Sequence, residues 1–305
     1  MVSLVPTVLV VGILVFLMIH LTGTDPAAVI LGSQASPESV AALNAQLGYD
    51  RPLWEQFISW IGGAVTGDLG VSAYSQEPVT SMIVDRIPTT LSLAVVAMVM
   101  TLLIAIPTGI LAAWKRDSLL DPLFMSGSLL GISIPNFWAA LMLVSLFAVN
   151  LGWFPVAGYV PLSEGLWPWL SHLVLPGFVL AIQQAGLLAR MLRDGLLQVL
   201  HEDFVRTARA KGLGERSVLV GHALRNAMLP TLTEIGNAVA GLLGGVIIIE
   251  MVFAIPGIGN LLILSIEQRD LPVIQGAVMF VAICYVLVNL VTDLLYSYLD
   301  PRISA

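Results

Sequence analysis

The sequence predicts an all-α polytopic membrane protein with six transmembrane helices, and three observations support this fold class. Of 305 residues, 57% are hydrophobic and only 11% are charged, and the mean hydropathy is +0.92. A soluble protein carries roughly 25% charged residues, so this chain has too few to cover a water-soluble globule. Several apolar runs reach the roughly 20 residues that cross the hydrocarbon core. These runs are continuous and do not alternate, which favours helices over strands.

The six expected spans follow the apolar runs. They are residues 4–21, 88–114, 123–151, 172–192, 228–253 and 273–295. Pro88 suits the first turn of the second span, because its missing N–H would have no partner there. Pro135 lies in the middle of the third span and is expected to kink it. Gly127 and Gly131 lie four residues apart, a spacing that suits close helix packing.

The first span has an alternative interpretation as a signal peptide. Residues 1–5 contain no Lys or Arg, and no small-x-small cleavage site follows the apolar run cleanly. We therefore expect a retained transmembrane helix. The single cysteine, Cys284, excludes an internal disulfide bond.

The basic residues predict the orientation of the chain, because cytoplasmic loops of membrane proteins are enriched in Lys and Arg. With six spans, both termini lie on one side. If that side is the cytoplasm, only Arg51, Arg86 and Arg269 lie outside. The other ten basic residues are then at or near the cytoplasm: Lys115, Arg116, Arg190, Arg193, Arg206, Arg209, Lys211, Arg216, Arg225 and Arg302. This split predicts cytoplasmic N and C termini.

Two segments are expected on the extracytoplasmic side of the membrane. The longer one, residues 22–87, contains a helix start at residues 36–38 (Ser-Pro-Glu) and a helix end at Gly48. Its aromatic residues predict an amphipathic helix at the membrane interface: Trp54, Phe57 and Trp60. The second segment, residues 152–171, also carries three tryptophans, namely Trp153, Trp167 and Trp169. We interpret them as an interfacial aromatic belt, with ligand stacking as the alternative.

The segment between Arg190 and Arg225 carries seven of the thirteen basic residues. Residues 195–211 have apolar side chains at helical spacing, which predicts an amphipathic helix. Gly212 can adopt positive φ and is expected to end this helix. A second short helix is expected at residues 215–226, and Pro230 is expected to begin the fifth span. An ordinary basic cytoplasmic loop is the alternative.

Two motifs carry a family resemblance. Residues 207–213 (Thr-Ala-Arg-Ala-Lys-Gly-Leu) and 222–230 (His-Ala-Leu-Arg-Asn-Ala-Met-Leu-Pro) resemble the cytoplasmic "EAA" loop of bacterial ABC importer permeases. The chain is similar to the dipeptide/oligopeptide (peptide/nickel) transporter family, first-permease type. Further matching segments are residues 25–26, 35–38, 47–53, 67–70, 86–91, 250–259, 269–272 and 299–302. Thr207 replaces the acidic residue that begins the triplet, and the N-terminus lacks the usual basic residues.

The resemblance implies a type I ABC importer permease fold with three parts. These are a first helix and extracytoplasmic segment (1–87), a permease domain (88–298, with its coupling loop at about 194–227) and a cytoplasmic tail (299–305). In the family this loop docks on an ATP-binding subunit, which switches the membrane helices between inward-open and outward-open states. The implied coupling residues are Arg206, Thr207, Ala208, Arg209, Ala210, Lys211 and Gly212.

The resemblance also implies partners in a bacterial inner membrane. They are a second homologous permease, two ATP-binding subunits or domains and an extracytoplasmic substrate-binding protein. The implied cargo is a di- or oligopeptide, with haem, glutathione or a nickel chelate as alternatives. No cofactor is expected in this chain, since the partner subunits bind ATP and Mg. A nucleic-acid partner is not expected.

The chain is expected to be a non-catalytic subunit. Its only lysines, Lys115 and Lys211, do not follow a glycine, so the phosphate-binding Gly-x-x-x-x-Gly-Lys-Ser/Thr motif is absent from the sequence. The four histidines are scattered, and no metal site is expected. Two rival functions are weaker. A stand-alone ion-coupled transporter lacks an acidic relay in mid-membrane, and an intramembrane enzyme lacks a nucleophile–base pair.

Polar side chains inside spans are costly and tend to face the interior of the helix bundle. Four of them predict the lining of a translocation path for a polar cargo: Ser133, Asn136, Gln183 and Gln184. Hydrogen bonding between helices is an equally weighted alternative. Further polar residues in the spans are Glu234, Asn237, Glu250, Asn289 and Asp293. Glu250 and Asp293 lie near span ends, where we expect interfacial or subunit contacts.

Overall fold

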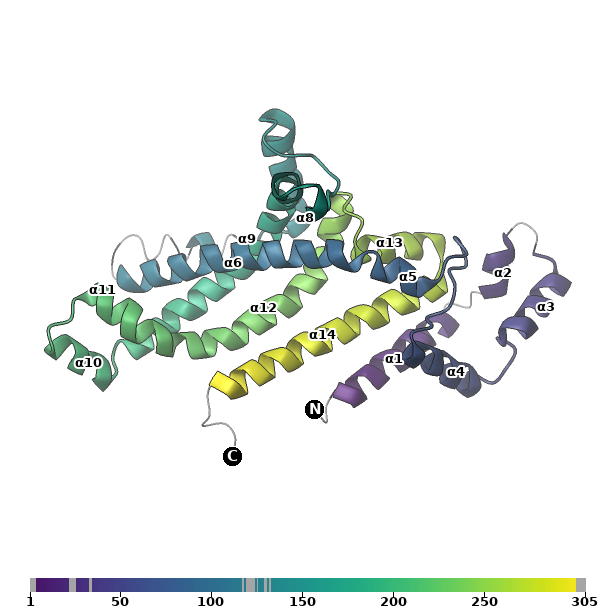
Figure 1. Ribbon diagram of the computed structural model, residues 1–305, viewed down its shortest axis with the longest axis horizontal. Helices are drawn as coiled ribbons and strands as arrows, with labels where there is room; N and C mark the ends of the chain where they lie inside the picture. Colours follow the sequence, from purple (N-terminus) through teal and green to yellow (C-terminus); the bar gives the residue numbers. More distant parts are fainter. Residues whose placement is uncertain are drawn as a thin grey trace. The chain divides into compact units, whose positions relative to one another are not determined.

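The structure is a computed structural model, which describes residues 4–21, 26–32, 35–116, 118, 124, 126–128, 131 and 133–299. Within these residues every named element is a helix, apart from an isolated β-bridge between Val71 and Pro78 (Figure 1). The chain forms two compact units, residues 1–90 with 256–286, and residues 91–255 with 287–305. The predicted all-α class is confirmed. Of the predicted tail, residues 300–305 lie outside the described residues.

Among the described residues, six helices lie wholly in the first unit. They are α1 (Leu4–Leu21), α2 (Pro26–Leu31), α3 (Pro37–Leu47), α4 (Leu53–Thr66), α5 (Val79–Val84) and α13 (Ile258–Gln268). Two long helices run through both units, α6 (Ile87–Trp114) and α14 (Leu271–Leu299). The second unit holds α8 (Asn136–Leu143), the π-helix η2 (Val144–Asn150), the 3-10 helix η3 (Leu162–Glu164), α9 (Leu166–Val199), α10 (Asp203–Ala210), α11 (Glu215–Ser217), the π-helix η4 (Val218–Ala223) and α12 (Leu224–Val252).

In the described part of the chain, four helical stretches are long and apolar enough to cross a membrane: Val79–Trp114, Leu166–Val199, Thr231–Val252 and Leu271–Thr292. The first predicted span coincides with α1, which has 18 residues. The third predicted span lies partly outside the described residues, and its described C-terminal part is the apolar stretch Asn136–Asn150. Apolar residues four apart on α6 are exposed, which gives this helix a stripe suited to lipid: Leu91, Val95, Val99 and Leu103.

Three helix boundaries differ from the sequence prediction. Pro135 does not kink a continuous helix but interrupts it, because its extended backbone (φ −60°, ψ 133°) caps the start of α8. The fourth span continues past residue 192 to Val199. Pro230 does not begin a new helix, because helical backbone runs without a break from Glu215 to Val252. Membrane helices tolerate an internal proline when the surroundings satisfy the freed carbonyl group.

The first unit confirms the helices predicted in the segment after α1. Ser36 and Ser39 form a reciprocal capping box at the start of α3, and Gly48 ends this helix with φ 77°. The amphipathic stretch is α4. Its Phe57 ring lies edge-on to Phe16 of α1, with 5.4 Å between the ring centroids. Trp54, at the start of α4, is 64% exposed, which suits an interfacial helix.

Asp270 anchors the loop that precedes α5 in the first unit. Its buried carboxylate accepts hydrogen bonds from the Ser72 hydroxyl and from the backbone N–H groups of Ala73 and Tyr74. Three donors on one carboxylate satisfy a charge that would otherwise be costly to bury. Apolar residues of α5, α13 and α14 pack nearby in one cluster, formed by Val79, Ile83, Ile258, Leu261, Val273 and Ala277.

The second unit is built around the α9–α12 pair, which runs side by side in Figure 1. Its main core cluster joins α6, α8, α9 and α12 and includes Leu93, Leu173 and Ile249. Small residues set the helix spacing. A Cβ added at Gly109 of α6 would lie 2.8 Å from the carbonyl oxygen of Ala189 in α9. No side chain fits in that space without moving one helix backbone.

We therefore expect Gly109→Ala to destabilise the protein by about 1–3 kcal/mol through overpacking. Gly244→Ala on α12 is the matched control, since an added Cβ there meets nothing within 4 Å. Alanine has the better helix propensity, so the control is expected to be neutral or up to about 1 kcal/mol more stable. Unfolding by denaturant in detergent micelles measures both values. Equal effects of the two substitutions would contradict the close-packing explanation.

Candidate functional site

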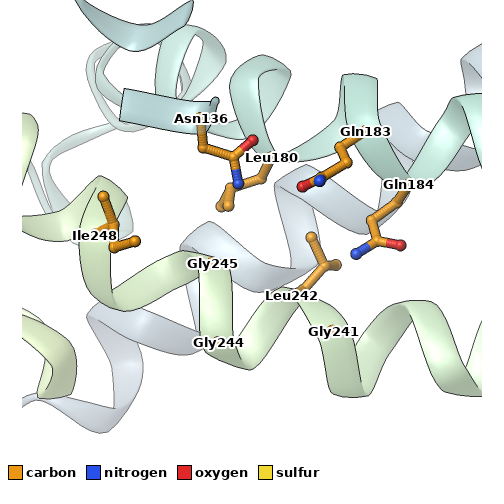
Figure 2. A pocket seen from close by; sticks show the side chains of 9 residues that line it. All are labelled: Asn136, Leu180, Gln183, Gln184, Gly241, Leu242, Gly244, Gly245 and Ile248. Atoms are coloured by element: carbon orange, nitrogen blue, oxygen red, sulfur yellow. The ribbon is translucent and has the colours of Figure 1, made fainter. Parts of the chain in front are cut away.

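A pocket of about 250 Å³ lies between α8, α9 and α12 in the second unit (Figure 2). Its lining residues are Asn136, Leu180, Gln183, Gln184, Gly241, Leu242, Gly244, Gly245 and Ile248. Three of the four side chains predicted to line a path, Asn136, Gln183 and Gln184, therefore come together here. Ser133 is described, but it does not line this pocket.

Glycines of α12 make room for the amide side chains. Figure 2 shows the amides of Asn136 and Gln184 directed toward α12. A Cβ added at Gly241 would lie 2.7 Å from Nε2 of Gln184. One added at Gly245 would lie 2.9 Å from the Leu180 side chain and 3.5 Å from Nδ2 of Asn136. The amides thus lie close against the α12 backbone only because these positions lack side chains.

These glycines were not predicted from the sequence. Their signal is the run Gly241-Leu-Leu-Gly244-Gly245, in which the three glycines fall at positions i, i+3 and i+4. This spacing places them on one side of a helix. The packing face predicted from the sequence was instead Gly127 and Gly131. Of these, Gly131 does approach α9, because an added Cβ would lie 3.2 Å from the Ile182 carbonyl oxygen.

The polar side chains that line the pocket are uncharged amides. Each amide side chain offers an acceptor oxygen and two N–H donors, and no lining residue is charged. Such a surface can exchange hydrogen bonds with the peptide groups of a cargo, whatever the cargo side chains are. Among the described residues, no group of three or more His, Cys, Asp or Glu is placed to hold a metal ion.

The predicted coupling residues lie on α10 and in the turn that follows it. Two side chains of this helix, Val205 and Ala208, are buried in a cluster with Val218 of η4. Every other residue of α10 is exposed, including Phe204, whose large apolar side chain is 42% accessible. Gly212 has φ 82°, as predicted for a helix end. Ala208 therefore packs inward, while the remaining predicted coupling residues face outward.

The helix boundary predicted for this segment was wrong. Residues 195–199 continue α9, and the separate helix begins only at Asp203. The apolar spacing misled the prediction because Leu196 is buried beside Leu192 in the second unit's core. Glu202 has extended backbone (φ −70°, ψ 151°), which interrupts the helical conformation between α9 and α10.

An ion pair that the sequence analysis missed closes the turn after α10. Arg209 donates from Nε to Oε1 of Glu215 at 2.8 Å and from Nη2 to Oε2 at 3.1 Å. This two-pronged geometry is stronger and more directional than a single contact. Arg206 also pairs with Asp203, at 3.2 Å, but both of those side chains are highly exposed and this pair contributes little.

Comparison with known proteins gives two family matches. Residues 105–305 match the family described as "Binding-protein-dependent transport system inner membrane component". Residues 1–94 match the family described as "Binding-prot-dependent transport system membrane comp, N-term".

Curated relatives match over nearly the whole chain. A protein of Brucella abortus named as a peptide transport system permease is 45% identical over 299 residues, which cover 98% of this chain and 95% of the relative. The dipeptide transport system permease protein DppB of Escherichia coli K12 is 41% identical, with the same coverage of both chains. DppB of Alkalihalophilus pseudofirmus is 40% identical and covers 99% of this chain and 96% of its own.

Among solved structures, the MetNI methionine ABC transporter in an inward-facing conformation is similar in fold. The TM-score is 0.60 at 16% identity, and the match covers 72% of this chain and 97% of that one. At this identity the likeness shows the fold alone. It agrees with the predicted type I importer permease architecture.

The Arg209–Glu215 pair predicts a local effect on the turn between α10 and α11. Arg209→Gln should speed amide hydrogen exchange at residues 212–215 by a few-fold, because an exposed ion pair contributes up to about 1 kcal/mol. The exchanged pair, Arg209→Glu with Glu215→Arg, should restore most of the protection. Arg206→Gln is the matched control and should leave this turn unchanged. Identical exchange in all variants would show that the pair does not hold the turn.

Proposed function

Since the chain belongs to the family of binding-protein-dependent transport system inner membrane components, we propose that this ABC transporter permease subunit imports short peptides. The pocket carries this proposal. Three amide side chains and a glycine-lined helix surround an uncharged polar space that can bind peptide groups. The relatives named for peptide or dipeptide transport support the same cargo. Haem, glutathione or a nickel chelate is the alternative cargo.

The proposed path for the peptide passes Asn136, Gln183 and Gln184. Ser133 lies three residues before Asn136 in the chain and is included in the proposed path. Amide groups in a span are stable when they hydrogen-bond to other helices or to a passing polar group. Within the described part of the chain, the side-chain amides of Asn136, Gln183 and Gln184 form no hydrogen bond. Their donors and acceptors are therefore available to a cargo.

We propose that α10 is the element that docks on an ATP-binding subunit. It presents nearly all of its surface outward, and the exposed aromatic ring of Phe204 is a suitable anchor for a groove. The proposed contact residues are Arg206, Thr207, Arg209, Ala210, Lys211 and Gly212, with Ala208 holding the helix in place from within. Without a phosphate-binding motif in its sequence, the chain must receive the energy of ATP hydrolysis from outside.

The proposed assembly contains a second homologous permease, two ATP-binding subunits that carry ATP and Mg, and a substrate-binding protein on the outer face. The chain is a multi-pass protein of the inner membrane. The distribution of basic residues supports cytoplasmic termini, with α10 on the cytoplasmic side and the segment from α2 to α5 outside. In that position the outer segment can receive the binding protein.

The docking role of α10 predicts that Phe204→Ala weakens coupling. Loss of a buried aromatic anchor commonly costs about 2 kcal/mol or more of binding, so transport-linked ATP hydrolysis should fall at least tenfold at limiting subunit concentration. Val220→Ala is the control, because Val220 is an apolar residue of η4 with similar exposure, 49%. Unimpaired coupling in the Phe204 variant would refute docking through this face.

Import of peptides predicts a response to the binding protein. Addition of peptide-loaded binding protein to the complete complex in proteoliposomes should raise ATP hydrolysis and produce uptake of the labelled peptide. Empty binding protein serves as the control. An assembled, ATP-hydrolysing complex that takes up no peptide, but does take up haem or a metal chelate, would replace the proposed cargo.

A further inference from the structure

The polar face that lines the pocket continues along α12 toward its N-terminal end. With 3.6 residues per turn, Glu234, Gly241, Gly245 and Ile248 lie within about 40° of one direction around the helix. Asn237 lies beside this line, and its Nδ2 donates to Oε2 of Glu234 at 3.2 Å. Glu234 is thus the carboxylate on the pocket-lining face of α12, about 10.5 Å along the helix from Gly241.

The positively charged Arg190 lies on α9 at the level of Glu234 on α12. Arg190 follows Gln183 by seven residues, which places both within about 20° of one direction around α9. The two helices run antiparallel, since Gln184 lies against Gly241 and Leu180 against Gly245. Continuing this register places Glu234 level with residues 188–191. Ile235 agrees with this level, because it packs against the core cluster that contains Leu188 and Ala189.

Neither charge is neutralised by the other. Arg190 and Glu234 are both half-buried, and none of the salt bridges found among the described residues involves either of them. Unpaired charges inside membrane spans are costly, so they are commonly retained for a ligand or an ion. A lone cation bound at Glu234 would be repelled by Arg190, and a lone anion bound at Arg190 would be repelled by Glu234. A ligand with one charge of each sign suits both.

We propose that Arg190 and Glu234 form a binding site for the two charged termini of a short zwitterionic peptide. Glu234 accepts hydrogen bonds from the terminal ammonium group, and Arg190 donates to the terminal carboxylate. Two extended residues span at most about 7 Å, so the termini can reach side chains of both helices only at an open face of the pair. Met191 of α9 and Asn237 of α12 are exposed at this level. Longer peptides would place one terminus here and their peptide groups at the amides of the pocket.

This inference rests on the proposed peptide cargo, but its test does not use transport. Replacement of Cys284 by Ala removes the chain's only cysteine. Asn237→Cys then introduces a reporter thiol beside Glu234, at an exposed position. In the complex of the two permeases with the ATP-binding subunits, without ATP or binding protein, labelling of this chain by N-ethylmaleimide is followed by mass spectrometry. Leu103→Cys, at a 69% exposed apolar position of α6, is the lipid-facing control.

Dialanine should slow labelling of the reporter but not of the control. N-acetyl-dialanine and dialanine amide each lack one terminal charge, and at least about tenfold more of either should be needed for the same protection. Glu234→Gln should weaken protection by dialanine to the level of the N-acetylated peptide.

Equal protection by the three peptides, no protection by any of them, or a reporter that does not label would overturn the proposal. The comparison of the three peptides uses the chain with Glu234 intact, so it decides the matter even if the Gln variant does not assemble. A complex that binds dialanine here but does not import it would contradict the proposed function and leave this site standing.

Discussion

Close contact between α9 and α12 is the constraint on which the second unit depends. Lipid tails are as apolar as leucine, so membrane helices gain little from hydrophobic burial and associate mainly through van der Waals packing and polar contacts. Here the contact is made at small residues along the pair. Gly195 faces Ala227 at one end, and Gly245 faces Leu180 at the other. The glycines bring the backbones near enough for dispersion contacts to accumulate.

Helix α12 also connects the two candidate functional regions. α10 packs on η4 through Val205 and Ala208. From η4 the chain continues as unbroken helix into α12, whose glycines form one wall of the pocket. A displacement of α10 therefore acts on a rigid helix that carries a pocket wall. The π-helical geometry of η4 interrupts the regular hydrogen-bond ladder at the junction, which makes this the natural place for such a helix to adjust.

The sequence alone predicted much of the helical architecture, because long apolar runs and capping residues act locally. Gly48 and Gly212 ended helices as expected, since positive φ is a property of the residue itself. The failures were at Pro135, at Pro230 and at the start of the helix predicted over residues 195–211. Whether helical backbone continues through Pro230 depends on neighbouring helices that satisfy the freed carbonyl group. Whether the chain stays helical at Gly195 depends on what lies opposite it, which here is Ala227. Neither fact is encoded locally.

The pocket could be predicted only in part for a related reason. Asn136, Gln183 and Gln184 were identifiable because amides in a span are rare and costly. The residues that make space for them carry no polar group, so the rule that found the amides could not find Gly241 or Gly245. A polar path through a membrane protein needs both kinds of residue. In the proposed path the amides bind the cargo, and the glycines leave room for it to enter and leave, so the space has to remain only partly filled.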